Sequence, residues 1–180
     1  MINFFIKNNM IKETGYWTSD DTQAIHVHDP NLAEWISNYL YNDKDKQLID
    51  FGCGMGDYLK KLNSKGFTNL YGFEGEVRKG SPDFVDSWDL TNPIKDYKHY
   101  THLKNNAYNT ICLEVGEHIP KQYESIFLNN ITSLTMNKII LSWAVIGQLG
   151  DGHVNCMNND EVISKMKKLG FNYLEDDSIS

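Results

Sequence analysis

The stretch Leu48-Ile49-Asp50-Phe51-Gly52-Cys53-Gly54-Met55-Gly56 decides the fold of this chain. An apolar, strand-like run that ends in an acid and Phe leads into three glycines spaced two apart, and a helix-like stretch follows at 57–62. Glycine lets the backbone turn sharply and approach a ligand closely. The N-terminus of the next helix offers unpaired N–H groups to a negative group. We therefore predict a strand, turn and helix that cradle a nucleotide-containing cofactor, with these residues at the ligand: Asp50, Gly52, Cys53, Gly54 and Gly56.

The spacing of the glycines distinguishes between two kinds of cofactor. A dinucleotide site uses Gly-x-Gly-x-x-Gly to make room for a pyrophosphate, whereas this chain has Gly-x-Gly-x-Gly with Asp50 in front of it. No Tyr-x-x-x-Lys pair, which a short-chain hydride-transfer enzyme would need, occurs in the sequence. The pattern resembles motif I of the class I S-adenosylmethionine-dependent methyltransferases. The resemblance covers residues 28–175 and implies S-adenosylmethionine as the cofactor.

Strand-like and helix-like segments alternate along the rest of the chain. This alternation predicts an α/β fold, a Rossmann-like doubly wound sheet that is mostly parallel and carries helices on both faces. We expect the strands at 47–51, 70–74, 84–88, 109–115, 138–143 and 171–174, and the helices at 30–40, 57–65, 121–134 and 160–169.

Two domain-level expectations follow from this alternation. Residues 1–28 form an N-terminal extension and possible lid, and residues 29–180 form the cofactor-binding domain. The antiparallel strand that usually closes the sheet of this class is missing before Ser180. The resulting open edge makes either a monomer or a homodimer plausible.

Acids at the strand ends are candidates for the cofactor's nucleoside. Glu74 ends the second strand, where a carboxylate can accept hydrogen bonds from ribose hydroxyls; otherwise it is a solvated acid. The resemblance implies that Asp89 receives the adenine amino group and that Leu90 covers the ring, although Asp89 could instead cap a helix before Asn92-Pro93. Asp50 acts on the ligand through water or only braces the glycine turn.

The chemistry is expected directly after the fourth strand, where Glu114, Glu117 and His118 form a Glu-x-x-Glu-His pattern. Glu114 is also a candidate cofactor-binding residue. This pattern resembles that of small-molecule O-methyltransferases, such as those of ubiquinone biosynthesis, and that of small-RNA 2′-O-methyltransferases. In these groups such residues are associated with a divalent metal. Two carboxylates and an imidazole suit Mg, Mn or Zn, and His153 could complete the set.

A role without metal is the alternative for these side chains. His118 or His153 would then act as the base that activates an oxygen acceptor, because the ordinary pKa of His lies near neutrality, or these residues would only shape the pocket. The candidate catalytic residues are His118, Glu117 and His153. We expect methylation of a small-molecule or sugar-like acceptor, most plausibly at oxygen, by in-line displacement. The alternatives are a non-catalytic cofactor-binding module and an RNA 2′-O-methyltransferase.

Two flanking segments are candidates for the acceptor side. Residues 141–155 are similar to a segment of uncharacterised bacterial, phage and viral methyltransferases, and their glycines suggest an ordered loop over the acceptor. In the N-terminal extension, Tyr16 and Trp17 could stack on an acceptor, and His26 and His28 could line the pocket.

Composition limits the partners and the location. The net charge of −7 argues against nucleic acid and against an anionic membrane surface, since phosphate binding needs clustered Lys and Arg. The three cysteines have no zinc-ligand spacing, which favours a reducing cytoplasm. No run approaches the ~20 apolar residues of a membrane span.

Overall fold

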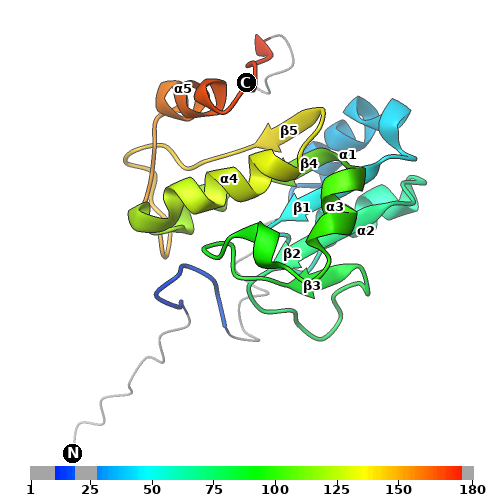
Figure 1. Ribbon diagram of the computed structural model, residues 1–180, viewed down its shortest axis with the longest axis horizontal. Helices are drawn as coiled ribbons and strands as arrows, with labels where there is room; N and C mark the ends of the chain where they lie inside the picture. The colour runs from blue at the N-terminus through cyan, green and yellow to red at the C-terminus, as the bar shows by residue number, and fades with distance from the viewer. Residues whose placement is uncertain (1–10, 19–27, 176–180) are drawn as a thin grey trace, which may run out of the picture.

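The computed structural model describes residues 11–18 and 28–175, and a five-stranded parallel sheet forms its centre (Figure 1). The strand order is β3-β2-β1-β4-β5, and each neighbouring pair is parallel. The strands are β1 (Gln47–Phe51), β2 (Leu70–Glu74), β3 (Val85–Ser87), β4 (Ala107–Cys112) and β5 (Lys138–Leu141). This confirms the predicted Rossmann-like sheet, and no closing antiparallel strand occurs in the ranges just given.

Helices cover both faces of the sheet. The helices are α1 (Pro30–Tyr39), α2 (Asp57–Ser64), α3 (Tyr100–Asn106), α4 (Glu124–Leu134) and α5 (Asn159–Lys168). Short 3₁₀ turns also occur: η2 (Tyr41–Asp43), η3 (Ile94–Asp96), η4 (Gly116–His118) and η5 (Lys121–Tyr123). One apolar cluster joins α1 and α2 to the sheet, and a second joins α3 and α4 to it. The sheet is therefore doubly wound, as predicted.

Two segments differ from the sequence prediction. The sequence predicts a sixth strand at 171–174, but the structure has no strand there, so this prediction is wrong. Tyr173 and Leu174 are 48% and 52% exposed, which means that no sheet surface buries these side chains. Helix α3 lies in a segment that reads as a polar connector, because Leu103 is its one fully buried apolar residue and gives no periodic signal.

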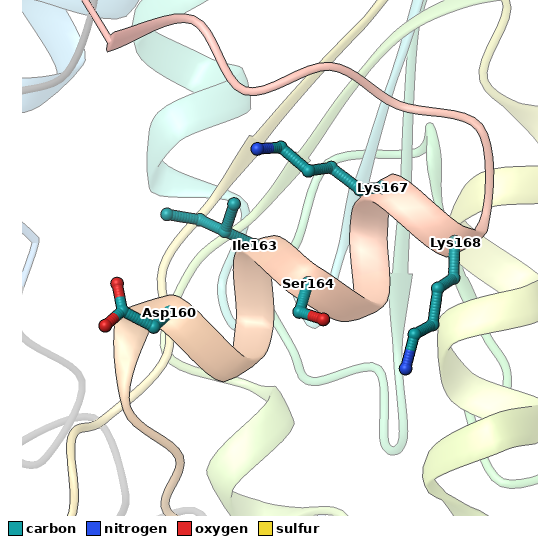
Figure 2. Close-up of a pocket in the computed structure, with 5 residues that line it drawn as sticks. All are labelled: Asp160, Ile163, Ser164, Lys167 and Lys168. Carbon is teal, nitrogen blue, oxygen red and sulfur yellow. The ribbon is translucent and has the colours of Figure 1, made fainter.

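The outer face of α5 carries a shallow hollow of its own (Figure 2). Its lining residues all come from this helix: Asp160, Ile163, Ser164, Lys167 and Lys168. Since one helix supplies the whole hollow, no side chains converge on it from different elements. We assign it no chemistry.

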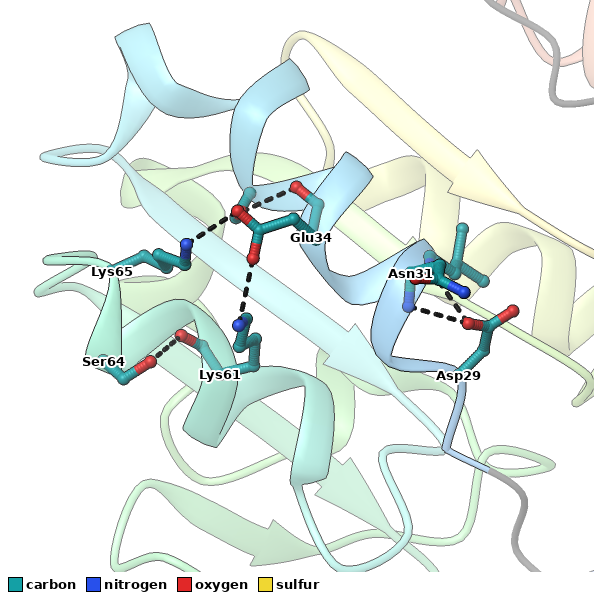
Figure 3. A network of polar contacts seen from close by, with 8 residues as sticks. Asp29, Asn31, Glu34, Lys61, Ser64 and Lys65 are labelled. Atoms are coloured by element: carbon teal, nitrogen blue, oxygen red, sulfur yellow. Dashed lines mark hydrogen bonds and ion pairs between the residues drawn. The ribbon is translucent and has the colours of Figure 1, made fainter.

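Helix α1 begins as the sequence predicts. The Asp29 carboxylate accepts the backbone N–H groups of Asn31 at 2.8 Å and Leu32 at 3.2 Å, and Pro30 occupies the first helical position (Figure 3). The cap fixes where the chain enters the helix, next to the carboxyl end of β1.

The strand order places the candidate site. The chain runs from β1 outward to β2 and β3 and then returns to β4 on the other side of β1. Parallel sheets of this kind hold their ligands beyond the carboxyl ends of the strands, where the order reverses. The crevice between β1 and β4 is that position.

Candidate active site

A cavity of about 640 Å³ opens at the carboxyl ends of the strands. Its walls come from the glycine turn after β1, from the ends of the other four strands, from residues 148–153 and from residues 14–17. The size falls within the range typical of small-molecule and cofactor sites. Except for Gly56, and for His26 outside the described ranges, every candidate site residue predicted from the sequence lines this one cavity.

The glycine turn has the backbone conformation that its sequence predicts. Gly52, Gly54 and Gly56 all have positive φ, at 75°, 56° and 72°, which side chains other than glycine rarely adopt. A Cβ on Gly52 would stand 2.4 Å from a methyl carbon of Val115. Gly56 is the N-cap of α2, so the first N–H groups of that helix point toward the cavity side of the turn.

The Glu74 carboxylate braces this turn. One oxygen accepts the N–H of Gly54 at 2.8 Å, and the other accepts the N–H of Gly75 at 2.9 Å. Glu74 is buried and lines the cavity. Because an ionised carboxylate has about four acceptor positions, two remain for a ligand's hydroxyl groups. The Cys53 thiol lies against Gly72 of β2, and Cys53 contributes backbone to the turn.

Asp50 is the buried acid in front of the turn. Burial, together with the nearby Glu74 carboxylate, raises the pKa of Asp50 to about 8. A carboxyl group in this state is largely protonated at neutral pH and responds strongly to any positive charge that enters the cavity. This position agrees with either of its predicted roles.

The end of β3 supplies the wall expected to face the adenine ring. Asp89, Leu90 and Trp88 line the cavity there. One Asp89 oxygen accepts both the N–H and the hydroxyl of Thr91, at 2.9 and 2.7 Å. Asp89 therefore closes a local turn rather than capping a helix, and its other oxygen is not part of that turn.

The segment after β4 turns sharply into the cavity. Glu114 has φ of 54°, a left-handed conformation that is uncommon for a residue with a side chain. Its N–H donates to the Ser142 hydroxyl at 2.8 Å, which ties the end of β4 to the end of β5. The turn directs η4 so that Glu117 and His118 also line the cavity.

Glu117 is the most unusual side chain of the site. It is fully buried, and neither carboxylate oxygen has a hydrogen-bond partner of normal geometry in the part of the chain that the structure describes. Burial raises the pKa of Glu117 to about 7; the neighbouring Glu114 carboxyl contributes to this rise, and the nearby backbone N–H groups of Glu117 and Ala144 oppose it. A buried carboxyl without partners is costly unless a ligand or a cation satisfies it.

Two histidines stand beside Glu117. One ligand atom from each of Glu117, His118 and His153 can lie within 4.8 Å of the others, and the two imidazole centroids are 5.0 Å apart. Nδ1 of His118 contacts the Gly152 carbonyl at 3.2 Å, and Nδ1 of His153 contacts the Gln148 carbonyl at 3.3 Å. A carbonyl only accepts, so both Nδ1 atoms donate, and each neutral ring then carries its lone pair on Nε2.

These three residues are three of the four metal ligands expected from the sequence. Glu114, the fourth expected ligand, lies beside Glu117 and lines the same cavity but is not part of the trio. The trio suits a divalent cation, because the donors are one carboxylate and two imidazoles with oriented Nδ1–H groups.

The loop after β5 is held in place over the trio. The Glu117 carbonyl accepts the N–H groups of Val154 at 2.8 Å and Asn155 at 2.9 Å. The Trp143 indole N–H donates to the Asn155 carbonyl at 2.7 Å. The loop that carries His153 is therefore ordered, as the sequence suggests.

The N-terminal segment closes another side of the cavity. A Cβ on Gly75 would meet the Tyr16 ring at 2.3 Å, so this ring packs directly on the residue after Glu74. The Trp17 ring stands edge-on to His118, with centroids 6.3 Å apart. His28 lines the cavity and packs on Tyr58, whereas His26 lies outside the described residues.

Several cavity residues were not singled out individually from the sequence: Asp29, Asp57, Tyr58, Ser142 and Asp151. Ser142 and Asp151 belong to residues 141–155, the segment expected to form an ordered loop over the acceptor. The other three carry no spacing signal, because the folding of α1 and α2 brings them to the cavity.

A family profile described as "Methyltransferase domain" matches residues 25–176. The chain belongs to this family. It is a class I, S-adenosylmethionine-dependent methyltransferase, as the glycine turn predicts. No curated protein matches its sequence.

Solved methyltransferase structures share the fold of this methyltransferase at low sequence identity. Magnesium protoporphyrin IX methyltransferase from Synechocystis PCC 6803, solved with bound SAH, is 18% identical with a TM-score of 0.57, over 81% of this chain and 74% of that one. The methyltransferase domain of bacterial CtHen1-C is 16% identical with a TM-score of 0.55, over 77% and 80%. The Burkholderia thailandensis 1,6-didemethyltoxoflavin-N1-methyltransferase is 9% identical with a TM-score of 0.59, over 86% and 73%.

The residues of the cavity fit the methyl donor. The glycine turn packs so closely on Val115 that a Cβ at Gly52 would collide with it. The N–H groups at the start of α2 suit the donor's carboxylate. Glu74 retains acceptor capacity for ribose hydroxyls.

No helix in the described ranges is long and apolar enough to span a bilayer.

Proposed function

We propose that this methyltransferase transfers the methyl group to a hydroxyl oxygen of a small-molecule or sugar-like acceptor. The observation that carries the proposal is the burial of both unpartnered Glu117 oxygens beside two oriented imidazoles, in the same cavity as the glycine turn. A hydroxyl acceptor must lose its proton during methyl transfer. A neutral amine, in contrast, can attack through its lone pair without first losing a proton. A site with a carboxyl group and two imidazoles provides several groups that can take or hold that proton.

We further propose that Glu117, His118 and His153 hold a divalent cation when one is available. His and carboxylate donors together favour Mn²⁺ or Zn²⁺ over Mg²⁺. A cation there would supply charge that lowers the pKa of an acceptor hydroxyl. Without a cation, His118 is the candidate base, since its Nδ1–H is fixed on the Gly152 carbonyl and Nε2 carries the lone pair.

In-line displacement requires the acceptor oxygen, the methyl carbon and the sulfur to be aligned. Well-oriented reactants can gain about 7–11 kcal/mol of barrier reduction from alignment. The ordered loop that carries His153 and the rings of Tyr16 and Trp17 are the walls that would position the acceptor. These residues make the N-terminal segment a candidate lid.

The test measures metal binding and methyl transfer separately. Metal-free protein is titrated with Mn²⁺ and Zn²⁺, and His118→Ala and His153→Ala are compared with His99→Ala, whose ring is exposed and outside the cavity. We expect each of the first two variants to lose at least about tenfold in Mn²⁺ affinity and the control to retain it.

Transfer is followed with isotopically labelled methyl donor and pooled hydroxyl compounds, and the product is analysed for the atom that carries the methyl group. A product methylated on nitrogen or carbon would overturn the oxygen acceptor. Unchanged turnover in His118→Ala, with intact cofactor affinity, would remove His118 from the chemistry.

A further inference from the structure

The charged side chains that line the cavity are all acidic. Eight carboxylates line it: Asp29, Asp50, Asp57, Glu74, Asp89, Glu114, Glu117 and Asp151. Among the described lining residues there is no Lys or Arg. Even without the two most deeply buried of them, Asp50 and Glu117, six carboxylates remain. Six negative charges would outnumber even a divalent cation bound by the histidines.

The lysines of the same region are placed elsewhere. On the outer face of α1, Glu34 pairs with Lys61 at 3.0 Å and Lys65 at 2.7 Å, both from α2 (Figure 3). At the start of the same helix, Asp29 faces the cavity and accepts backbone N–H groups. Of the eight lining acids, Asp57 alone forms an ion pair with a described Lys or Arg, at 3.0 Å from Lys60. The cavity therefore keeps its negative charge.

A second observation points to a ligand of positive charge. Glu117 has two buried oxygens without partners, and it lies on the same wall. A buried carboxylate gains from any cation brought close, because the local dielectric constant is lower than that of water. The N–H groups of Gly52, Gly54 and Gly56 are donated within the protein, so the first N–H groups of α2 are left as the donors for the one anionic group of the methyl donor.

We propose that this cavity is selective for positive charge: it binds the cationic methyl donor more tightly than the neutral demethylated product, and it admits neutral or cationic acceptors while excluding anionic ones such as sugar phosphates. The donor carries a net charge of +1 through its sulfonium, and the product carries none. Loss of the methyl group therefore removes the charge that the wall attracts, so product release is favoured. The acceptor half of this inference rests on the proposed function.

The donor half is tested with known ligands. The affinities of S-adenosylmethionine, S-adenosylhomocysteine and sinefungin, whose protonated amine replaces the sulfonium, are measured by calorimetry at low and high salt. We expect both cations to bind at least about fivefold more tightly than the product at low salt, and the ratio to shrink as salt screens the wall. Equal or tighter binding of the product at low salt would overturn the proposal.

The acceptor half is tested without knowing the acceptor. A small-molecule extract is separated by ion exchange into anionic, neutral and cationic pools, and each is incubated with protein and labelled donor. Label in the neutral or cationic pool supports the proposal, and label mainly in the anionic pool refutes it. If no pool is labelled while the cations bind more tightly than the product, the charge selectivity stands and the proposed small-molecule function fails.

A charge reversal at the rim provides the matched variant. Asp151→Lys changes a lining residue of the exposed loop, and Asp160→Lys makes the same change of net charge on α5, outside the cavity (Figure 2). We expect Asp151→Lys to lower the ratio of cation to product affinity by about twofold or more and Asp160→Lys to leave it unchanged. Equal effects of both variants would assign the selectivity to overall charge instead of to the cavity, which would refute it.

Discussion

The acid in front of the glycine turn should make the stability of this methyltransferase fall with rising pH. Asp50 is 3% exposed, and burial raises its pKa from 3.8 to about 8. A carboxyl whose pKa is raised in the folded state adds stability below its unfolded pKa, and this stability is lost as the pH rises through the folded pKa. The loss therefore falls between about pH 4 and pH 8.

The size of the loss follows from these values. Between about pH 5 and pH 7 the unfolded chain has released the Asp50 proton and the folded chain still holds it, so the free energy of unfolding falls by about 2.6 kcal/mol. Glu117, with its pKa raised to about 7, adds about 2 kcal/mol over the same range. The pKa values of Asp86 and Glu124 are lowered, and their contributions are largely complete by about pH 5.

The assay is urea denaturation of chelator-treated, ligand-free protein at about pH 5, 6 and 7. The Asn side chain has nearly the same shape as the protonated acid. In Asp50→Asn we therefore expect the fall in unfolding free energy between about pH 5 and pH 7 to be about 2.6 kcal/mol smaller than in the wild type, with only the Glu117 part left. Asp83→Asn, an exposed acid in the β2–β3 connection, is the control and should follow the wild type. An Asp50→Asn variant with the same pH dependence as the wild type would refute the reasoning.

Three further predictions concern the site. Glu74→Gln replaces one acceptor of a backbone N–H by a donor, so we expect a loss of about 1–3 kcal/mol in unfolding free energy and weaker product binding by calorimetry, with exposed Glu76→Gln unaffected. Gly52→Ala would place a Cβ 2.4 Å from Val115 at a positive φ and should abolish cofactor binding in the same assay; Gly147→Ala, also at positive φ but with open space around it, should bind normally. Ser142→Ala removes the acceptor of the Glu114 N–H and should lower methyl transfer more than it lowers product affinity, whereas Ser64→Ala on α2 should change neither.

The sequence predicts the fold well, because the fold depends on local patterns, and most of the candidate site residues line one cavity. Residues 48–56 carry the strand, the turn and the helix start in one stretch, and the structure confirms each of them. The strands are recovered because their residues form short apolar runs between turn signals. The error at 171–174 arises from the same rule, since an apolar run becomes a strand only when a neighbouring strand can pair with it.

The charge of the cavity could not be predicted from the sequence. The net charge of −7 gives no indication of which acids face the ligand. Glu34 and Asp29 lie five residues apart on or next to one helix, yet Glu34 pairs with two lysines on the outside and Asp29 faces the cavity. This sorting depends on the packing of α1 against α2, a contact between segments far apart in the sequence.

The position of Glu117 depends both on the spacing of residues in the sequence and on the conformation of the backbone. The spacing Glu-x-x-Glu-His places three candidate groups after β4, but it does not say which of the two acids is buried. The left-handed turn at Glu114 settles this, because it leaves the Glu114 side chain exposed and carries Glu117 under the loop that His153 belongs to. The acid with unsatisfied oxygens is thus the one next to the imidazoles, and the exposed acid shapes the charge at the entrance. If a cation binds, Glu117→Gln should therefore reduce its affinity more than Glu114→Gln does, and equal losses in Mn²⁺ titrations would contradict this assignment of roles.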